Sequence, residues 1–144
     1  ENAGQTHPGL DVVHALDHLD QLTDQLDLAP VTALGAAEPR IARAREKLLA
    51  VIDGAQSRIE ERADRPGLKS IQHRAEELAE LRRTGRQSLL EETAAGRLSP
   101  ETASDYLDAV RWLDTIAYHA WRTAAHLCPE PNGAPPPAVK EVER

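Results

Sequence analysis

The sequence predicts an all-α protein, an antiparallel up-and-down bundle of about four helices. Apolar residues recur at helical spacing along four segments of the chain, whereas the alternation at every second position that marks a strand is absent. Short stretches rich in proline and glycine separate these segments, which favours neighbouring helices that run in opposite directions. The 144 residues are 40% hydrophobic and 28% charged, an ordinary composition for one folded domain.

The first predicted helix covers residues 10–28 and has one apolar face. Asp11 lies near its start, where a negative charge suits the positive end of the helix dipole. Residues 1–9 precede it as a lead-in or as residues left over from cloning, and residues 29–39, with two prolines and a glycine, predict a loop. We expect the apolar face to point into the core; it is formed by Val12, Val13, Leu16, Leu19, Leu22 and Leu26.

The second and third helices are predicted over residues 40–63 and 68–95. Proline suits the first turn of a helix, so Pro39 marks the start of the second one. Gly54 weakens the middle of this helix by roughly 1 kcal/mol relative to alanine. The sequence Asp-Arg-Pro-Gly at 64–67 predicts a chain reversal, and Gly85 predicts a kink or local fraying in the third helix.

The last predicted helix, residues 100–127, contains every aromatic residue of the chain and has the clearest boundaries. Gly96 suits the end of the preceding helix, Ser99 is a good N-cap, and Pro100 fits the first helical position. An apolar stripe comprises Ala103, Tyr106, Leu107, Val110, Leu113, Ala117, Trp121 and Ala124. The opposite, polar face comprises Asp108, Thr115, His119, Arg122 and His126.

One folded domain is therefore expected over residues 10–128. Residues 129–144 hold five of the ten prolines and predict a disordered tail. Methionine is absent even at position 1, which predicts that the sequence is a piece of a longer protein. No run of apolar residues is long enough to span a membrane, and no signal peptide opens the sequence.

The charge distribution argues against a general nucleic-acid binder. The formal net charge is -7, whereas contacts to phosphates need a basic face. Residues 1–37 contain one glutamate, five aspartates and no lysine or arginine, so this part alone contributes -6. The single cysteine, Cys128, permits no internal disulfide and fits a reducing compartment.

Asp114 is the residue that conflicts most with its surroundings. It lies inside the apolar stripe between Val110 and Trp121, where an unpaired carboxylate costs several kcal/mol. We expect an arginine of the second or third helix to pair with it; the alternative is a ligand of an interhelical metal or anion site. Trp112, at the edge of the stripe, is expected to pack under a neighbouring helix.

Two groups on the first helix are candidate metal ligands. Asp17, Asp20 and Asp24 share one side of the helix, where they form either a solvated or ion-paired edge or an oxygen site for a divalent or ferric ion. His14 and His18 are one turn apart, which suits two ligands of one transition metal. A helical wheel places both histidines opposite the apolar face, and this position favours solvent exposure without a function.

No catalytic or cofactor-binding residue can be named, because no nucleophile, base and orienting group occur together. His119 and His126 on the last helix are expected to face solvent and to titrate near neutral pH.

Three stretches carry a resemblance to a known family. They are HALDHLDQL at 14–22, RRTGRQSLLEETAAGRLSPETA at 82–103 and AVRWLDTIAYHAWRTAAHL at 109–127. Together they resemble the cytoplasmic PhoU-like domain that follows the membrane part of bacterial sodium/phosphate cotransporters. The order and spacing of the stretches are the same as in that family.

The resemblance implies a PhoU-like helical bundle with a regulatory or assembly role in phosphate symport and no catalysis of its own. Its location would be the cytoplasmic face of the inner membrane. Its partners would be the membrane-embedded part of the same transporter or regulators of that transporter, with a homodimer left open. PhoU-like proteins also bind metal clusters through Asp/Glu-x-x-x-Asp motifs. Asp20 and Asp24 match this motif once, whereas Asp114 is followed by Tyr118 at the second position.

Two other classes remain open from the sequence. One is a histidine-phosphotransfer bundle that uses His14 or His18, although the usual lysine and glycine are absent around His14. The other is the soluble tail of a sodium/proton antiporter, whose helical segments share the charge pattern of residues 80–105.

Overall fold

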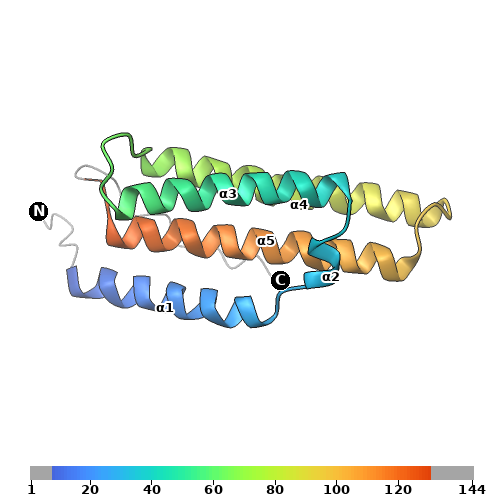
Figure 1. Cartoon of the computed structure of the whole chain (residues 1–144), viewed down its shortest axis with the longest axis horizontal. Helices are drawn as coiled ribbons and strands as arrows, with labels where there is room; N and C mark the ends of the chain where they lie inside the picture. The colour runs from blue at the N-terminus through green and yellow to red at the C-terminus, as the bar shows by residue number, and fades with distance from the viewer. Residues whose placement is uncertain (1–7, 131–144) are drawn as a thin grey trace, which may run out of the picture.

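The computed structural model describes residues 8–130, and this part of the chain consists of helices joined by short connections, without a strand. Successive long helices run in opposite directions (Figure 1), as predicted for an up-and-down arrangement. The prediction of an all-α fold is confirmed, although the described residues form five helices in place of four. Their bounds are α1 Pro8–Asp27, α2 Val31–Leu34, α3 Pro39–Ile59, α4 Leu68–Ala94 and α5 Pro100–Leu127.

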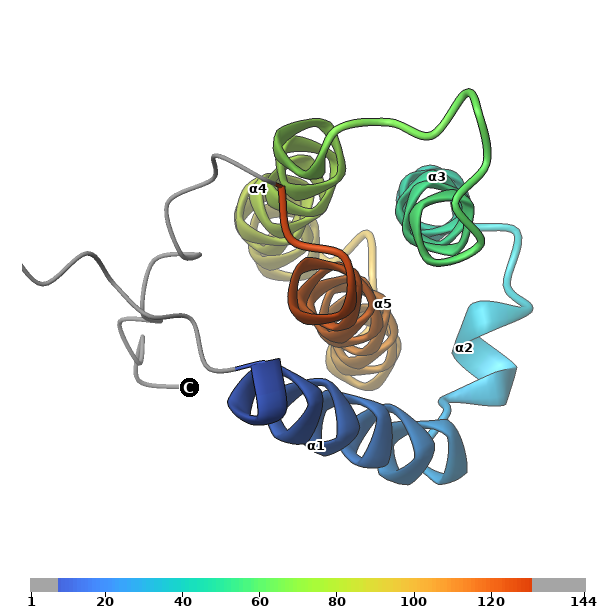
Figure 2. The ribbon, with the colours of Figure 1, turned by 90° about the vertical axis from the view of Figure 1, so that its left-hand side faces the viewer.

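α5 lies in the middle of the fold, with α3, α4 and α1 arranged around it (Figure 2). α3 and α4 pack against each other and against α5, whereas α1 packs extensively only against α5. Burying apolar side chains between α3, α4 and α5 is the main stabilising contribution, since each fully buried Leu or Ile contributes about 1.5–3 kcal/mol. Deeply buried side chains of this core include Ile41, Val51, Ile71, Leu78, Leu113 and Ala117.

α2 is the helix that the sequence did not predict. It occupies four residues of the predicted loop, after Pro30, and it contacts α5. Ala33 is 7% exposed and belongs to the core, so burial of this alanine favours the short helix. A single helical turn has no periodicity of its own, and the neighbouring proline and glycine signals dominated the sequence pattern.

The residues that predicted the end of one helix and the start of the next have these roles in the connection between α4 and α5. Gly96 adopts a left-handed φ of 69°, and the Ser99 hydroxyl accepts a hydrogen bond from the Thr102 backbone N–H at 3.1 Å. α5 begins at Pro100, as predicted. α3 ends at Ile59, before the predicted Ala63, because Glu61 takes a left-handed φ of 53° and turns the chain out of the helix. α4 continues without interruption through Gly85, where a kink or fraying was expected.

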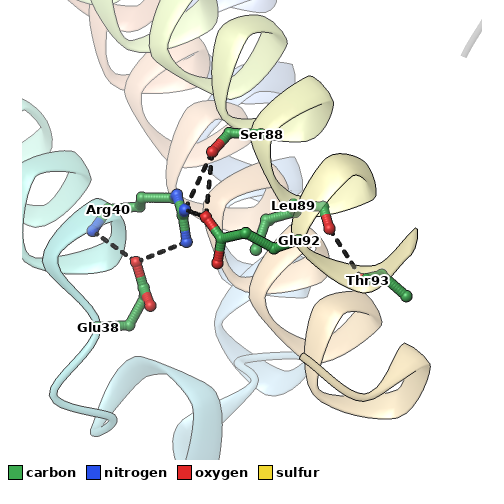
Figure 3. A network of polar contacts seen from close by, with 6 residues as sticks. All are labelled: Glu38, Arg40, Ser88, Leu89, Glu92 and Thr93. Carbon is green, nitrogen blue, oxygen red and sulfur yellow. Dashed lines mark hydrogen bonds and ion pairs between the residues drawn. The ribbon is translucent and has the colours of Figure 1, made fainter. Parts of the chain in front are cut away.

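A polar network joins the start of α3 to the end of α4 (Figure 3). The Arg40 guanidinium donates to Glu38 at 3.0 Å and to Ser88 at 3.0 Å, and it also pairs with Glu92. Glu38 accepts a further hydrogen bond from the Arg40 backbone N–H at 3.1 Å and thereby caps α3. The network holds this end of the bundle together by charge-assisted hydrogen bonds on partly exposed groups.

The chain directly after α5 contacts the start of α4 through Glu130. The Glu130 carboxylate accepts a hydrogen bond from the Leu68 backbone N–H at 2.8 Å and lies 3.8 Å from the Arg58 guanidinium. This carboxylate caps α4, whose own N-cap, Gly67, has no side chain. The rest of the predicted tail lies outside the described residues. None of the helices in the described part combines the length and apolar character that crossing a membrane requires.

Gly54 lies where α3 approaches α4 closely. A Cβ at this position would lie 3.1 Å from the Ile71 Cγ1 and 3.3 Å from the Pro66 Cγ. Ile71 is fully buried and Pro66 is rigid, so neither neighbour can move away freely. The glycine that weakens the isolated helix therefore permits the packing of the two helices.

We expect Gly54→Ala to destabilise the fold by about 1 kcal/mol, because the overpacking cost exceeds the gain in helix propensity. Gly85→Ala in α4 is the matched control, since a Cβ there has no neighbour within 4 Å. The control should stabilise the protein by about 0.5–1 kcal/mol. Urea unfolding followed by circular dichroism measures both free energies; equal stabilisation by the two substitutions would contradict the close approach at Gly54.

Candidate functional site

α1 docks on α5 through a side that is small and polar. The docked row consists of residues spaced by three or four positions along α1: Asp11, Ala15, His18, Leu22 and Gln25. Ala15 is 1% exposed, and the Trp112 indole N–H donates to the Gln25 backbone carbonyl at 2.7 Å. Trp112 therefore packs under a neighbouring helix, as the sequence predicted.

Four histidines meet at this interface and form the histidine cluster: His14, His18, His119 and His126. The Nδ1 atoms of His18 and His119 lie 3.0 Å apart, so one ring donates a hydrogen bond to the other. The centroid of the His18 ring lies 5.6 Å from that of His126, and the two rings are stacked. The ring centroids of His14 and His126 are 5.2 Å apart. His119 is only 5% exposed.

The predicted orientation of α1 is therefore wrong. His14 is exposed, but its ring faces α5, and His18 is partly buried against His119 instead of facing solvent. The expectation that His119 and His126 face solvent is also wrong, because α1 covers the polar side of α5 and the His126 side chain is only 9% exposed. Four of the five docked residues precede an apolar residue of the predicted inward face by one position, which is about 100° around an α-helix; the fifth, Leu22, was itself predicted to face inward. α1 is thus rotated by about a quarter turn from the predicted orientation.

Burial and neighbouring positive charges keep two of these histidines neutral at pH 7. Burial lowers the pKa of His18 to about 4, with further lowering by His119, Arg122 and His126; Asp17 opposes the shift. Burial also lowers the pKa of His126, and the Asp11 carboxylate, 3.4 Å from its Nδ1, partly offsets that effect. Arg122 contributes to both shifts and lies 3.3 Å from the His126 Nε2. The interface therefore disfavours a positive charge on His18 and on His126.

The predicted metal ligands are not brought together. Within residues 8–130, no group of three or more His, Cys, Asp or Glu side chains is placed so that it could hold a metal ion. Asp17, Asp20 and Asp24 are exposed on α1, and none of them forms an ion pair with a described residue. Of the two alternatives without a metal, a solvated edge or an ion-paired one, the described residues show the solvated edge. Metal binding at Asp20 and Asp24 stays a prediction.

Asp114 has the arginine partner that the sequence predicted. Its carboxylate lies 2.9 Å from the Arg82 guanidinium of α4, and the residue is 9% exposed. Asp114 is therefore engaged with α4, while the other candidate ligands lie on α1. A buried carboxylate with a charged partner is a structural contact of the bundle core.

The apolar residues of α1 that were expected to enter the core are mostly exposed. Only Leu22 packs against the core cluster. The exposed members include a set spaced by three, four or seven residues, here named the apolar row: Val12, Leu16, Leu19 and Leu26, which are 50%, 60%, 42% and 60% exposed. The sequence pattern revealed an apolar stripe, but it did not reveal that the stripe lacks a cover within the described residues.

Comparison of the chain with models of protein families, with curated proteins and with solved structures found no match.

The ion pair at Asp114 predicts different effects for two neighbouring arginines. Arg82→Gln should destabilise the protein by on the order of 1–2 kcal/mol, because a buried carboxylate loses its charged partner. Arg83→Gln is the matched control: its side chain is 76% exposed and pairs with Glu80 on the surface. The control should change stability by less than about 0.5 kcal/mol. Thermal and urea unfolding measure both effects, and equal losses would rule out a structural role of the Arg82 pair.

The histidine cluster predicts a loss of stability in acid. The pKa of His18 is about 4 in the folded state and 6.5 in the reference state, so the unfolded chain binds more protons between these values. The stabilisation is complete above pH 6.5 and is lost as the pH falls towards 4. Because His18 is partly exposed, the loss should be on the order of 1 kcal/mol.

Urea unfolding at pH 7 and pH 5 tests this expectation. His18→Asn should flatten the difference between the two pH values, whereas His73→Asn, at a side chain that is 73% exposed, should preserve it. Identical pH dependence of the wild type and His18→Asn would show that the cluster does not control acid stability.

Proposed function

We propose that this chain is a regulatory or assembly domain of a sodium-dependent phosphate transporter, acting through protein contacts at the cytoplasmic face of the inner membrane. The observation that carries the proposal is the exposed apolar row of α1. Leu16 and Leu26 are each 60% exposed, although they lie on a regular helix that could have turned them inward.

The distribution of exposed hydrophobic side chains supports the proposal that the domain acts through protein contacts. Seven of the thirteen large hydrophobic side chains that are exposed in the described part belong to residues 10–28. Apolar surface in water is unfavourable by about 25 cal/mol per Å², and exposed patches of several hundred Å² are typical of protein interaction sites. Since α1 is held by its docked row, a partner can cover the apolar row without displacing α1 from α5.

The transporter part of the proposal is supported by the resemblance. The stretch at 14–22 lies on α1 and the stretch at 109–127 lies on α5, so the two similar segments pack against each other. The proposed partner is the membrane-embedded part of the same transporter or one of its regulators. The proposal has two further elements that are independent of this partner. The domain forms a homodimer, and Asp20 and Asp24 bind a divalent or ferric ion.

Sodium-dependent uptake of labelled phosphate tests the proposal in cells that lack other phosphate transporters and express the natural full-length protein. Replacing Leu16 and Leu19 together by Gln should change uptake or its response to phosphate by about fivefold, a typical coupling between a regulatory contact and its target. Leu49→Gln on α3 is the control, because Leu49 is also exposed, at 65%, but lies outside α1. This control should leave uptake unchanged.

Two results would contradict the proposal in different ways. Absence of sodium-dependent phosphate uptake with the natural protein would remove the transporter assignment. Normal uptake in the double Gln variant, at an unchanged protein level in the membrane fraction, would remove α1 as the regulatory contact.

A further inference from the structure

The exposed side of α1 has the spacing of a coiled-coil seam. Val12, Leu16 and Leu19, followed by Thr23 and Leu26, are separated by four, three, four and three residues. This alternation is the heptad repeat with which one helix packs along another. Thr23 is the polar member, and it is exposed together with the apolar row. A broad stripe for a bundle core would include more positions on each turn.

A second, acidic row borders the seam on one side. Its members each follow a seam residue directly in the sequence: Asp17, Asp20, Asp24 and Asp27. All four are exposed, and none forms an ion pair within residues 8–130. α1 itself contains no lysine or arginine that could neutralise this row. The docked row lies on the other border of the seam and faces α5, so within residues 8–130 the acidic row is the charged border that remains uncovered.

We propose that the seam binds a partner helix whose own apolar seam is bordered by lysine or arginine. This inference rests on the proposed function as a contact domain and specifies the chemistry of the partner. The heptad spacing selects a helix as the occupant, because knobs of one helix fill holes of the other only when both repeat in this way. The acidic row then selects basic residues at the facing border positions, since charges at these positions set partner choice and orientation.

The same charges disfavour two other occupants. In a two-fold antiparallel pair of α1 helices, the acidic rows of both copies would lie on the same side and repel each other. An anionic membrane surface would likewise repel a segment that carries -6 over residues 1–37. A basic helix removes both conflicts and neutralises the row.

Two labelled synthetic peptides of about four heptads test the inference by fluorescence anisotropy with the full chain. They share one Leu/Ile seam and differ only in their border residues, Lys in one and Glu in the other. At low salt we expect the Lys-bordered peptide to bind at least about tenfold more tightly, and the preference should shrink at about 0.5 M NaCl as the charges are screened.

Three variants separate the contributions of the two rows. Leu16→Gln combined with Leu19→Gln should abolish binding of both peptides. Asp20→Asn combined with Asp24→Asn should retain binding but lose most of the preference for the Lys-bordered peptide. Asp105→Asn combined with Asp108→Asn removes two exposed carboxylates from α5 and should leave the preference intact. Because all these residues are exposed, circular dichroism should show folded variants.

Equal affinity for the two peptides, or an unchanged preference in the Asp20 and Asp24 variant, would overturn the inference. Self-association that the double Gln variant abolishes, without binding of either peptide, would identify a second copy as the occupant and would also overturn it. The Lys-bordered peptide could fail to bind while phosphate uptake still responds to the α1 substitutions. This result would reject only the basic helix as the partner. The proposed contact function would then stand.

Discussion

The contact between α1 and the polar side of α5 determines how the rest of the surface is arranged. α3 and α4 cover the apolar stripe of α5, which leaves a side containing Thr115 and His119 to be covered by α1. Buried polar groups are unfavourable unless they find hydrogen-bond partners. α1 therefore turns its polar side inward, where His18 meets His119 and the Gln25 carbonyl meets the indole of Trp112.

This orientation gives the two sides of α1 different roles. One side is part of the folded domain and favours a neutral His18, since burial, His119 and Arg122 all disfavour a proton on this ring. The other side presents apolar and acidic rows that the described residues leave uncovered. The same helix thus combines a pH-sensitive internal contact with a surface suited to a partner. The contact with α5 fixes the rotation of α1 about its own axis, and this rotation determines which residues form the exposed side.

Much of the fold could be predicted because its signals are local. Ser99 and Pro100 mark the start of α5 through hydrogen bonding and backbone geometry that need no other part of the chain. The partner of Asp114 was predictable as a type, because a carboxylate in an apolar stripe requires a cation. α2 and the left-handed Glu61 were not predictable, since the first depends on burial of Ala33 and the second is rare for a residue other than glycine.

The sequence by itself determined that α1 is an amphipathic helix, that it carries aspartates but no lysine or arginine, and that histidines occur on α1 and α5. Only the tertiary structure decided which side of α1 is buried. A helical period gives the angle between rows but not the direction in which the helix faces, and that direction depends on the surface that α5 offers. His18 and His119 are 101 residues apart in the chain and become neighbours only through this packing, because no local signal relates them.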